Sequence, residues 1–287
     1  MVGRVVPAAS LGLVALATLS SSLACTPAGK VSEKHAEAHS RSLAELAKKD
    51  VLEIDRGLPD GARKLAPLFA KGDDPRSNLP GVRKELMRIR RDVPDLLTSK
   101  ATFLALADGK GIAIRNDLEE DAMAGKNLIE IFPDLSKARD ACVATVGAFP
   151  GPAKPAGPDR DYIAACPVKN PEGATVGLLV TGWPYRSFAR HLQESLKREI
   201  TEQTRAADPG KLPILYVGVF DRAGVYMAPL TPKVDEDELV TLNLVEKTAS
   251  GHAQGVVTVT DRAFGWSADR VEKLGPDTGV VVLRSEI

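Results

Sequence analysis

The feature that most constrains the fold of this chain is a pattern that occurs twice. Residues 102–116 read TFLALADGKGIAIRN, an apolar run, an Asp-Gly turn and a second apolar run. Residues 215–227 read LYVGVFDRAGVYM, the same plan with Asp-Arg-Ala-Gly at the turn. Apolar runs joined by such turns are typical of β-hairpins. Each hairpin leads to an Asn-Leu-Ile or Asn-Leu-Val segment, at 127–129 and 243–245, and further strand-like runs follow. We therefore expect two copies of a unit ordered strand–strand–helix–three strands.

The composition of the chain is that of an ordinary globular protein. Its 287 residues have room for one large domain or two small ones. Apolar residues make up 44% and charged residues 26%, values that do not indicate disorder. Basic and acidic residues balance at 38 each, so no basic excess indicates a nucleic-acid partner.

The first 25 residues differ from the rest. Val5–Leu23 is uncharged and consists mainly of apolar and small residues, and Ser22-Leu23-Ala24-Cys25 follows a short basic start. This segment resembles the lipobox of bacterial lipoproteins, in which Cys25 would receive the lipid and become the mature N-terminus. The resemblance implies a signal peptide over 1–24, and Thr26 fits export onward to the outer membrane. A secretory signal cleaved nearby and an uncleaved membrane anchor remain alternatives, although a proline and a serine cluster disfavour the anchor.

Two further cysteines, Cys142 and Cys166, are predicted to form a disulfide. Two cysteines in an exported protein more often pair with each other than bind a metal. If 141–149 and 161–167 are antiparallel neighbours, a loop centred near residue 154 places the cysteines opposite each other. Opposed residues in such a pair lie ~4.5–5.5 Å apart at Cα, within disulfide reach. Two buried free thiols remain the alternative.

The chain is predicted to start with helices and to continue into two sheet domains. The predicted organisation is a signal peptide (1–24), a tether (25–34), an N-terminal helical segment (35–100), a first domain (101–184), a connecting helix (185–211) and a second domain (212–287). Within the helical segment, Gly57–Gly61 is expected to end one helix. Further helices are expected over 119–128 and 237–248. Strands joined mainly by hairpins imply antiparallel sheets, each packing helices on a face, which is an α+β fold.

One stretch of the first predicted domain resembles a known family of domains. The stretch from Leu106 to Leu128 reads LADGKGIAIRNDLEEDAMAGKNL, and it resembles the core of extracytoplasmic Cache domains and their PAS-fold relatives. In those domains a hairpin turns at Asp-Gly, and a Gly-Lys-Asn-Leu-like element opens a helix beside the ligand pocket. The helices before Thr102 are similar to the long helix that precedes the sheet in Cache domains. The resemblance covers 35–183 well and 212–287 loosely, and it implies two tandem PAS/Cache-like domains. Cache domains usually sit between two membrane helices in receptors with an output module, and we expect neither a second span nor an output module in this chain.

No catalytic or metal-binding motif stands out in the sequence. The spacings GxxxxGK[ST], GxSxG, HExxH and CxxC are absent. His35 and His39 lie four apart on a predicted helix, a spacing that could hold a metal, but a solvated helix face is the favoured interpretation. His191 and His252 are isolated. We therefore expect no enzyme, no metal site and no cofactor.

The best candidates for a ligand site are polar and aromatic residues at the ends of the predicted strands of the first domain. An arginine there would recognise a carboxylate, and aromatic residues would wall an apolar ligand. We expect Arg115 and Tyr162 to face one cavity. A turn-stabilising ion pair for Arg115 and a helix-anchoring role for Trp183 remain alternatives. The candidate residues are Arg115, Asn116, Asp117, Tyr162, Trp183, Tyr185 and Arg186.

Together these features predict a lipid-anchored sensor or binding protein that faces the periplasm. It would bind a small molecule in the first domain and signal to an envelope protein, with the membrane reached through the lipid on Cys25. The second domain, which offers Tyr216, Tyr226 and Trp266, would be structural. The alternative is a structural or protein-interaction lipoprotein whose PAS-like domains are empty scaffolds. The sequence does not identify the ligand, the partner or the oligomeric state.

Overall fold

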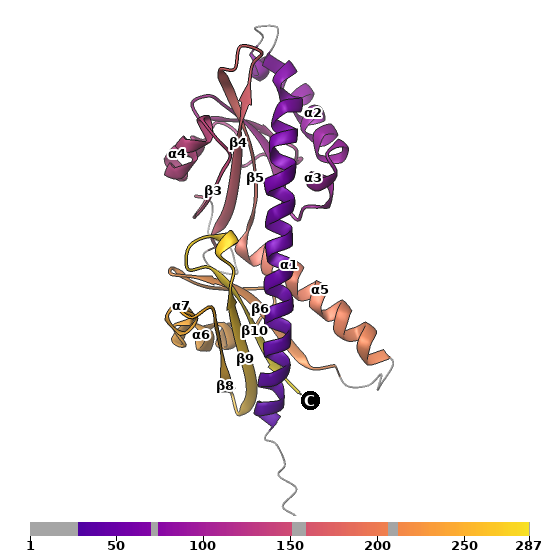
Figure 1. The fold of residues 1–287 in the computed structure, drawn as a ribbon, viewed down its shortest axis with the longest axis vertical. Coiled ribbons are helices and arrows are strands. Elements are labelled where there is room, and N and C mark those ends of the chain that lie inside the picture. The colour runs from indigo at the N-terminus through magenta and orange to yellow at the C-terminus, as the bar shows by residue number, and fades with distance from the viewer. Residues whose placement is uncertain (1–27, 70–73, 151–158, 206–211, 287) are drawn as a thin grey trace, which may run out of the picture.

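A single long helix and two sheets organise the molecule. A computed structural model describes residues 28–69, 74–150, 159–205 and 212–286. The helix α1 (Ala28–Leu65) runs along the molecule, and two five-stranded antiparallel sheets follow each other along it (Figure 1). The predicted α+β class with two tandem sheet domains is confirmed. The predicted signal peptide, Cys25 and residues 26–27 lie outside the described residues. In the described part of the chain, no helix is long and apolar enough to span a membrane.

The helix α1 continues through Gly57–Gly61, so the predicted break there was wrong. Its buried side chains are mostly apolar, among them Leu43, Ile54 and Leu58, and they recur along the 38 residues of the helix. The two glycines are used for close packing. A Cβ on Gly57 would lie 2.9 Å from the Leu96 backbone nitrogen, and one on Gly61 would lie 2.8 Å from Leu179 Cδ2. Burial of this face therefore outweighs the low helix propensity of glycine.

The first sheet has the strand order β2-β1-β5-β4-β3. Its strands are β1 (Phe103–Asp108), β2 (Ala113–Asn116), β3 (Val143–Gly147), β4 (Asp161–Lys169) and β5 (Thr175–Pro184). The short helices η1 (Ala66–Phe69), η2 (Pro75–Asn78), α2 (Leu79–Asp92) and α3 (Pro94–Thr98) connect α1 to this sheet. α1 and α2 pack on one face, and α4 (Leu128–Ile131) and η3 (Pro133–Arg139) cover the other.

The predicted helix over 119–128 does not form. This segment is a loop, and only the four residues of α4 become helical. The Asp121 carboxylate accepts hydrogen bonds from the backbone N–H groups of Asn116, Met123 and Ala124 at 2.8–3.0 Å. An aspartate that binds nearby backbone donors in this way competes with helix formation. The loop forms the outer wall of a cavity on this face of the sheet.

The second sheet repeats the topology of the first, in the order β7-β6-β10-β9-β8. Its strands are β6 (Ile214–Asp221), β7 (Gly224–Met227), β8 (His252–Val259), β9 (Arg262–Arg270) and β10 (Gly279–Ser285), with η4 (Glu272–Leu274) between the last two. The predicted helix over 237–248 is replaced by α6 (Lys233–Thr241) and α7 (Leu244–Lys247). Asn243 separates them with a left-handed backbone at φ 50°.

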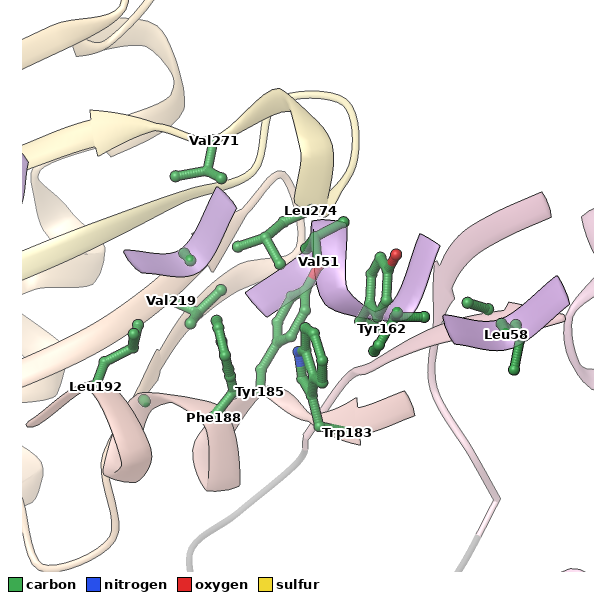
Figure 2. Packing of buried hydrophobic residues seen from close by; sticks show 14 of the residues in the cluster. Val51, Leu58, Tyr162, Trp183, Tyr185, Phe188, Leu192, Val219, Val271 and Leu274 are labelled. Atoms are coloured by element: carbon green, nitrogen blue, oxygen red, sulfur yellow. The ribbon is translucent and has the colours of Figure 1, made fainter. Parts of the chain in front are cut away.

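A continuous hydrophobic core joins the two domains. The helix α5 (Tyr185–Arg205) leaves the first sheet at the end of β5 and connects it to the second. Trp183 stacks between Tyr162 and Phe188, with ring centroids 4.8 and 4.5 Å away. Figure 2 shows these rings beside Val51 of α1, with Leu274 of the second domain next to them. The domains therefore share buried apolar surface along α1 instead of touching only through exposed groups.

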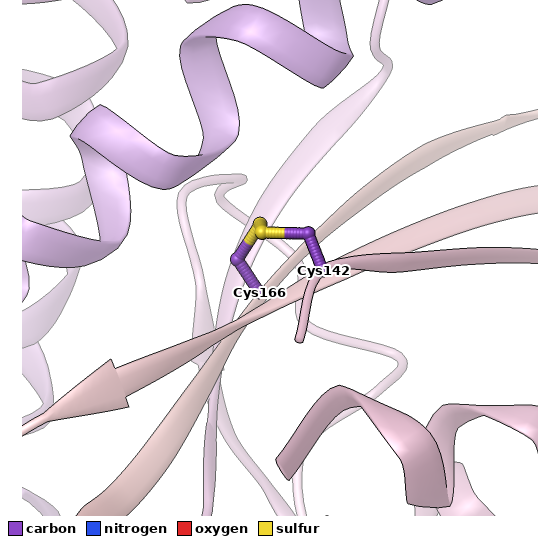
Figure 3. Close-up of a disulfide and its surroundings, with 2 residues drawn as sticks. All are labelled: Cys142 and Cys166. Carbon is purple, nitrogen blue, oxygen red and sulfur yellow. A yellow bond between two sulfur atoms is a disulfide. The ribbon is translucent and has the colours of Figure 1, made fainter. Parts of the chain in front are cut away.

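The predicted disulfide is confirmed. Cys142 lies directly before β3 and Cys166 lies on β4, where the pairing of Val143 with Ala165 places them opposite each other (Figure 3). Their Cα atoms are 4.1 Å apart and their sulfurs are bonded at 1.95 Å. The bond ties the edge strand of the first sheet to its neighbour.

The N-terminal end of α1 is fixed to the second sheet by close packing and polar contacts. Ser40 Oγ lies 2.7 Å from Ser267 Oγ and donates to Asp269 at 2.5 Å. The Arg284 guanidinium donates to His39 Nε2. Gly265 on β9 is covered so closely that a Cβ there would lie 1.9 Å from the Glu33 backbone nitrogen. This end of the helix therefore requires a glycine at that position.

The variant Gly265→Ala tests this packing. Because backbone atoms block the added methyl group, we expect the N-terminal turns of α1 to be displaced and the free energy of unfolding to fall by roughly 1–3 kcal/mol. Chemical denaturation measures this loss. Gly109→Ala is the control, because its nearest obstacle is a carbonyl oxygen at 3.4 Å. Equal stability of the two variants would contradict the packing described here.

His39 makes the stability of this end depend on pH. Burial, assisted by Arg284 and His35 and opposed by Glu286, lowers the pKa of His39 from 6.5 to about 4. The unfolded chain therefore binds a proton more readily, and stability present above pH 6.5 is lost as the pH falls toward 4. We expect His39→Gln, which keeps an acceptor for Arg284, to weaken this loss. Parallel profiles of melting temperature against pH for the two proteins would contradict it.

Candidate functional site

A cavity of about 320 Å³ lies on the face of the first sheet that is turned away from α1. Its floor comes from Phe103 on β1 and Ile163 on β4, and its outer wall from the loop between β2 and α4. The full lining is Thr102, Phe103, Asn116, Leu118, Glu120, Ala122, Met123, Lys126, Phe149, Pro150, Asp161, Ile163 and Pro184. The position follows from the sheet, because α1 fills the opposite face.

The loop that forms the outer wall is held by its own polar side chains. Arg115 pairs with Asp121 at 3.1 Å and donates to the carbonyl oxygens of Leu118 and Glu119. The Asn116 side-chain oxygen accepts from the Leu118 N–H at 2.9 Å. These contacts hold the loop in one conformation, in which it forms a wall of the cavity above the apolar residues of the sheet.

The lining is mainly apolar, but Lys126 and Asn116 can each donate further hydrogen bonds to a ligand. Lys126 Nζ donates to the Pro150 carbonyl at 3.0 Å and lies 4.6 Å from the centre of the Phe149 ring. Among the described residues, no carboxylate lies within ion-pair distance of Lys126, and no acceptor binds the Asn116 side-chain NH₂. An ammonium group without a carboxylate partner beside apolar walls can bind an anionic ligand group.

Two carboxylates also line the cavity. Asp161 is buried, and one of its oxygens accepts the Phe149 N–H at 3.0 Å. Glu120 lies exposed at the rim. Asp161 is therefore a buried part of the wall that already accepts a hydrogen bond, whereas Glu120 is exposed to solvent at the entrance.

Of the seven residues predicted from the sequence, only Asn116 lines this cavity. Its neighbour Asp117 accepts the Leu104 N–H at 2.8 Å and pairs with Arg90 of α2 at 2.9 Å, so it ties α2 to β1. Arg115 is engaged by the loop, which is the turn-stabilising alternative considered above. The expected meeting of Arg115 and Tyr162 in one cavity does not occur.

The remaining predicted residues lie on the other face of the sheet or beyond it. Side chains alternate along β4, so Ile163 faces the cavity and Tyr162 faces α1. Tyr162, Trp183 and Tyr185 belong to the shared core (Figure 2). Arg186 binds Glu236 of α6 through two hydrogen bonds, at 2.7 and 2.9 Å, and donates to the Met227 carbonyl. Although burial raises the pKa of Glu236, its bonds to Arg186 hold that pKa below its usual value.

Sequence reasoning missed Lys126, Met123, Phe149 and Asp161 as lining residues. For Lys126 a signal existed, since it stands in the Gly-Lys-Asn-Leu element that the Cache resemblance places beside a pocket. The next residue, Asn127, caps α4 by accepting the N–H groups of Ile129 and Glu130. For Phe149 and Asp161 no local motif exists, because the chain folds them together only across the sheet.

The histidines form no catalytic or metal-binding arrangement. His252 and Ser40 both bind Asp269, at 3.0 and 2.5 Å, so the carboxylate separates the histidine from the hydroxyl that it would need to activate. His35 binds Glu286 and His191 binds Asp50. Within the described ranges, no group of three or more potential ligands could hold a metal ion.

Known structures share this fold at low sequence identity. A domain described as a sensory box/GGDEF family protein from Vibrio parahaemolyticus matches with a TM-score of 0.58 at 10% identity, over 90% of this chain and 97% of that one. The extracellular domain of a protein described as a histidine kinase matches with a TM-score of 0.52 at 15% identity, over 90% and 95%. An extracellular ligand binding receptor from Desulfohalobium retbaense matches with a TM-score of 0.50 at 13% identity, over 86% of this chain but 39% of that one.

These likenesses concern the fold. No family model matches the chain, and no curated protein matches it. The two sheets and the preceding long helix match those of the histidine kinase extracellular domain and the sensory box/GGDEF domain, so the predicted α+β fold with two tandem sheet domains is confirmed. The neighbours described above are sensor and ligand-binding domains.

Proposed function

We propose that the protein is an extracytoplasmic binding protein that recognises a small apolar molecule bearing a carboxylate in the cavity of its first domain. The observation that carries this proposal is Lys126, an ammonium group with no carboxylate partner among the described residues, at the edge of a mainly apolar cavity. The extracellular ligand binding receptor with the same fold supports a binding role for such a domain.

The size and lining of the cavity define the ligand class. About 320 Å³ lies near the lower end of the volumes of small-molecule sites, which suits a molecule of few heavy atoms. Phe103, Met123 and Ile163 would bury its apolar body. Lys126 and the Asn116 amide would donate to its carboxylate.

The variant Lys126→Met tests this assignment. It keeps the apolar stem and removes the charge, so we expect affinity for the carboxylate ligand to fall at least tenfold, since a charge-assisted hydrogen bond contributes ~1.5–3 kcal/mol. The ligand is first sought by thermal shift with aliphatic and aromatic carboxylates, their neutral amides and the corresponding amino acids. Calorimetry then measures the affinity of each protein.

The control is Lys110→Met, an exposed lysine at the β1–β2 turn that does not line the cavity. It should bind like the wild type. Stabilisation by amides as strong as that by carboxylates would contradict the role of Lys126. If no compound in the panel stabilises the wild type, the interaction-scaffold alternative is favoured.

The predicted lipid on Cys25 would set the orientation at the membrane. Cys25 stands three residues before Ala28, the start of α1, and a chain of three residues spans about 10 Å. The start of α1 packs on the second sheet (Figure 1). A lipid anchor would therefore hold the second domain near the membrane and present the cavity of the first domain away from it, toward the periplasm and an envelope partner.

The anchor is tested on the protein from its native membranes. We expect mass spectrometry to find an acylated Cys25 as the first residue, with residues 1–24 removed, because the sequence before it has the pattern of a lipoprotein signal. The variant Cys25→Ser should then be released into the soluble fraction. An unmodified chain that begins at another residue would refute the lipid anchor.

A further inference from the structure

The second sheet ends in a strand that lacks the usual protection of a sheet edge. β8 forms one edge of this sheet, beside β9 (Figure 1). With eight residues it is the longest of the four edge strands in the two sheets, since β2 and β7 have four residues and β3 has five. Its sequence, HAQGVVTV, contains no proline, lysine, arginine or carboxylate. Proteins usually shield edge strands with such residues, so β8 is open to pairing with another strand.

The register of β8 identifies the backbone groups that point away from the sheet. The Arg270 N–H donates to the Gly251 carbonyl at 2.8 Å, and the same register continues along both strands. Alternate residues of an edge strand bond to its neighbour, and the others direct their N–H and C=O groups outward. The outward residues of β8 are His252, Gln254, Val256 and Thr258. Within the described part of the chain, no group binds these outward donors and acceptors.

The outward groups of β8 are self-complementary. If a second copy of β8 lies antiparallel about a two-fold axis at Gly255, His252 of each copy faces Thr258 of the other, and Gln254 faces Val256. Such a pair can exchange both of its hydrogen bonds, so every outward N–H and C=O group finds a partner. No like charges of lysine, arginine or carboxylate groups face each other, because the strand carries none.

The helix α1 leaves space for this pairing. In the second sheet it packs mainly on β9, one strand in from the edge. The two copies of β9 would be three strand spacings apart, about 14 Å, which exceeds the ~8–10 Å between packed helices. Gly29 lies against Val256, so both α1 helices start near the two-fold axis on the same face of the joined sheet. This arrangement allows both chains to be tethered to one membrane through Cys25.

We propose that β8 is a dimerisation edge, at which a second copy of this chain pairs antiparallel and joins the two second-domain sheets into one continuous sheet. The second copy is recognised through its backbone and its uncharged side chains, not through ion pairs. No residue of β8 lines the cavity of the first domain, so the dimer does not depend on the proposed carboxylate ligand.

Sedimentation velocity over a range of concentrations tests the dimer. The parent chain starts at residue 25 and carries Cys25→Ser, so that neither lipid nor a free thiol adds association. We expect its mass to double as the concentration rises. Val256→Pro removes an outward N–H but leaves the bonds to β9 intact. Because each copy then loses a hydrogen bond to the other, the dissociation constant should rise roughly tenfold or more. Val256→Thr keeps the N–H and should dimerise like the parent chain.

Amide hydrogen exchange gives a second measurement that needs no variant. In the dimer the N–H groups of Gln254 and Val256 should be protected, and dilution should remove this protection. The Val257 N–H points toward β9 and should stay protected at every concentration. A parent chain that stays monomeric would overturn the proposal and leave β8 open to a strand of another protein. A dimer that Val256→Pro does not weaken, or in which Gln254 and Val256 exchange freely, would also overturn it.

Discussion

The packing of one helix against two sheets is the constraint on which the structure depends. α1 covers one face of each sheet, so neither sheet buries the apolar side chains of that face without it. The close approach requires small residues at the contacts with the sheets, Gly61 in the helix and Gly265 in the second sheet. Because the same helix serves both sheets, the domains share one continuous core, and their relative position is fixed by buried apolar surface.

This arrangement also decides where each sheet can bind a ligand. The face toward α1 is filled by Leu104, Leu106 and Leu179, and a cavity forms on the opposite face, where a loop and one turn of helix replace a long helix. Alternation along β4 then assigns Ile163 to the cavity and Tyr162 to the side of α1. Tyr162, Trp183 and Tyr185 therefore belong to the shared core and not to the cavity.

Local patterns predicted the fold better than the site. The duplicated hairpin and the register that opposes Cys142 to Cys166 follow from turn chemistry and strand alternation, which neighbouring residues encode. The helix break at Gly57–Gly61 was wrong because tertiary contacts, invisible in the sequence, favour glycine there. The residues of the cavity could not be derived because Phe149 and Asp161 meet Lys126 only after the sheet has formed. Arg115 was predicted to bind a ligand, but it forms an ion pair with Asp121, which lies six positions later in the chain.

The connection between the cavity and the rest of the molecule runs through two consecutive residues. Asn116 faces the cavity, and Asp117 pairs with Arg90 of α2 while accepting the Leu104 N–H of β1. α2 in turn packs on α1. A ligand that draws the Asn116 amide toward its carboxylate would therefore pull on the segment that holds α2 to the sheet. Since α1 reaches the second domain without interruption, a shift of α2 has a rigid element through which to act on the second domain.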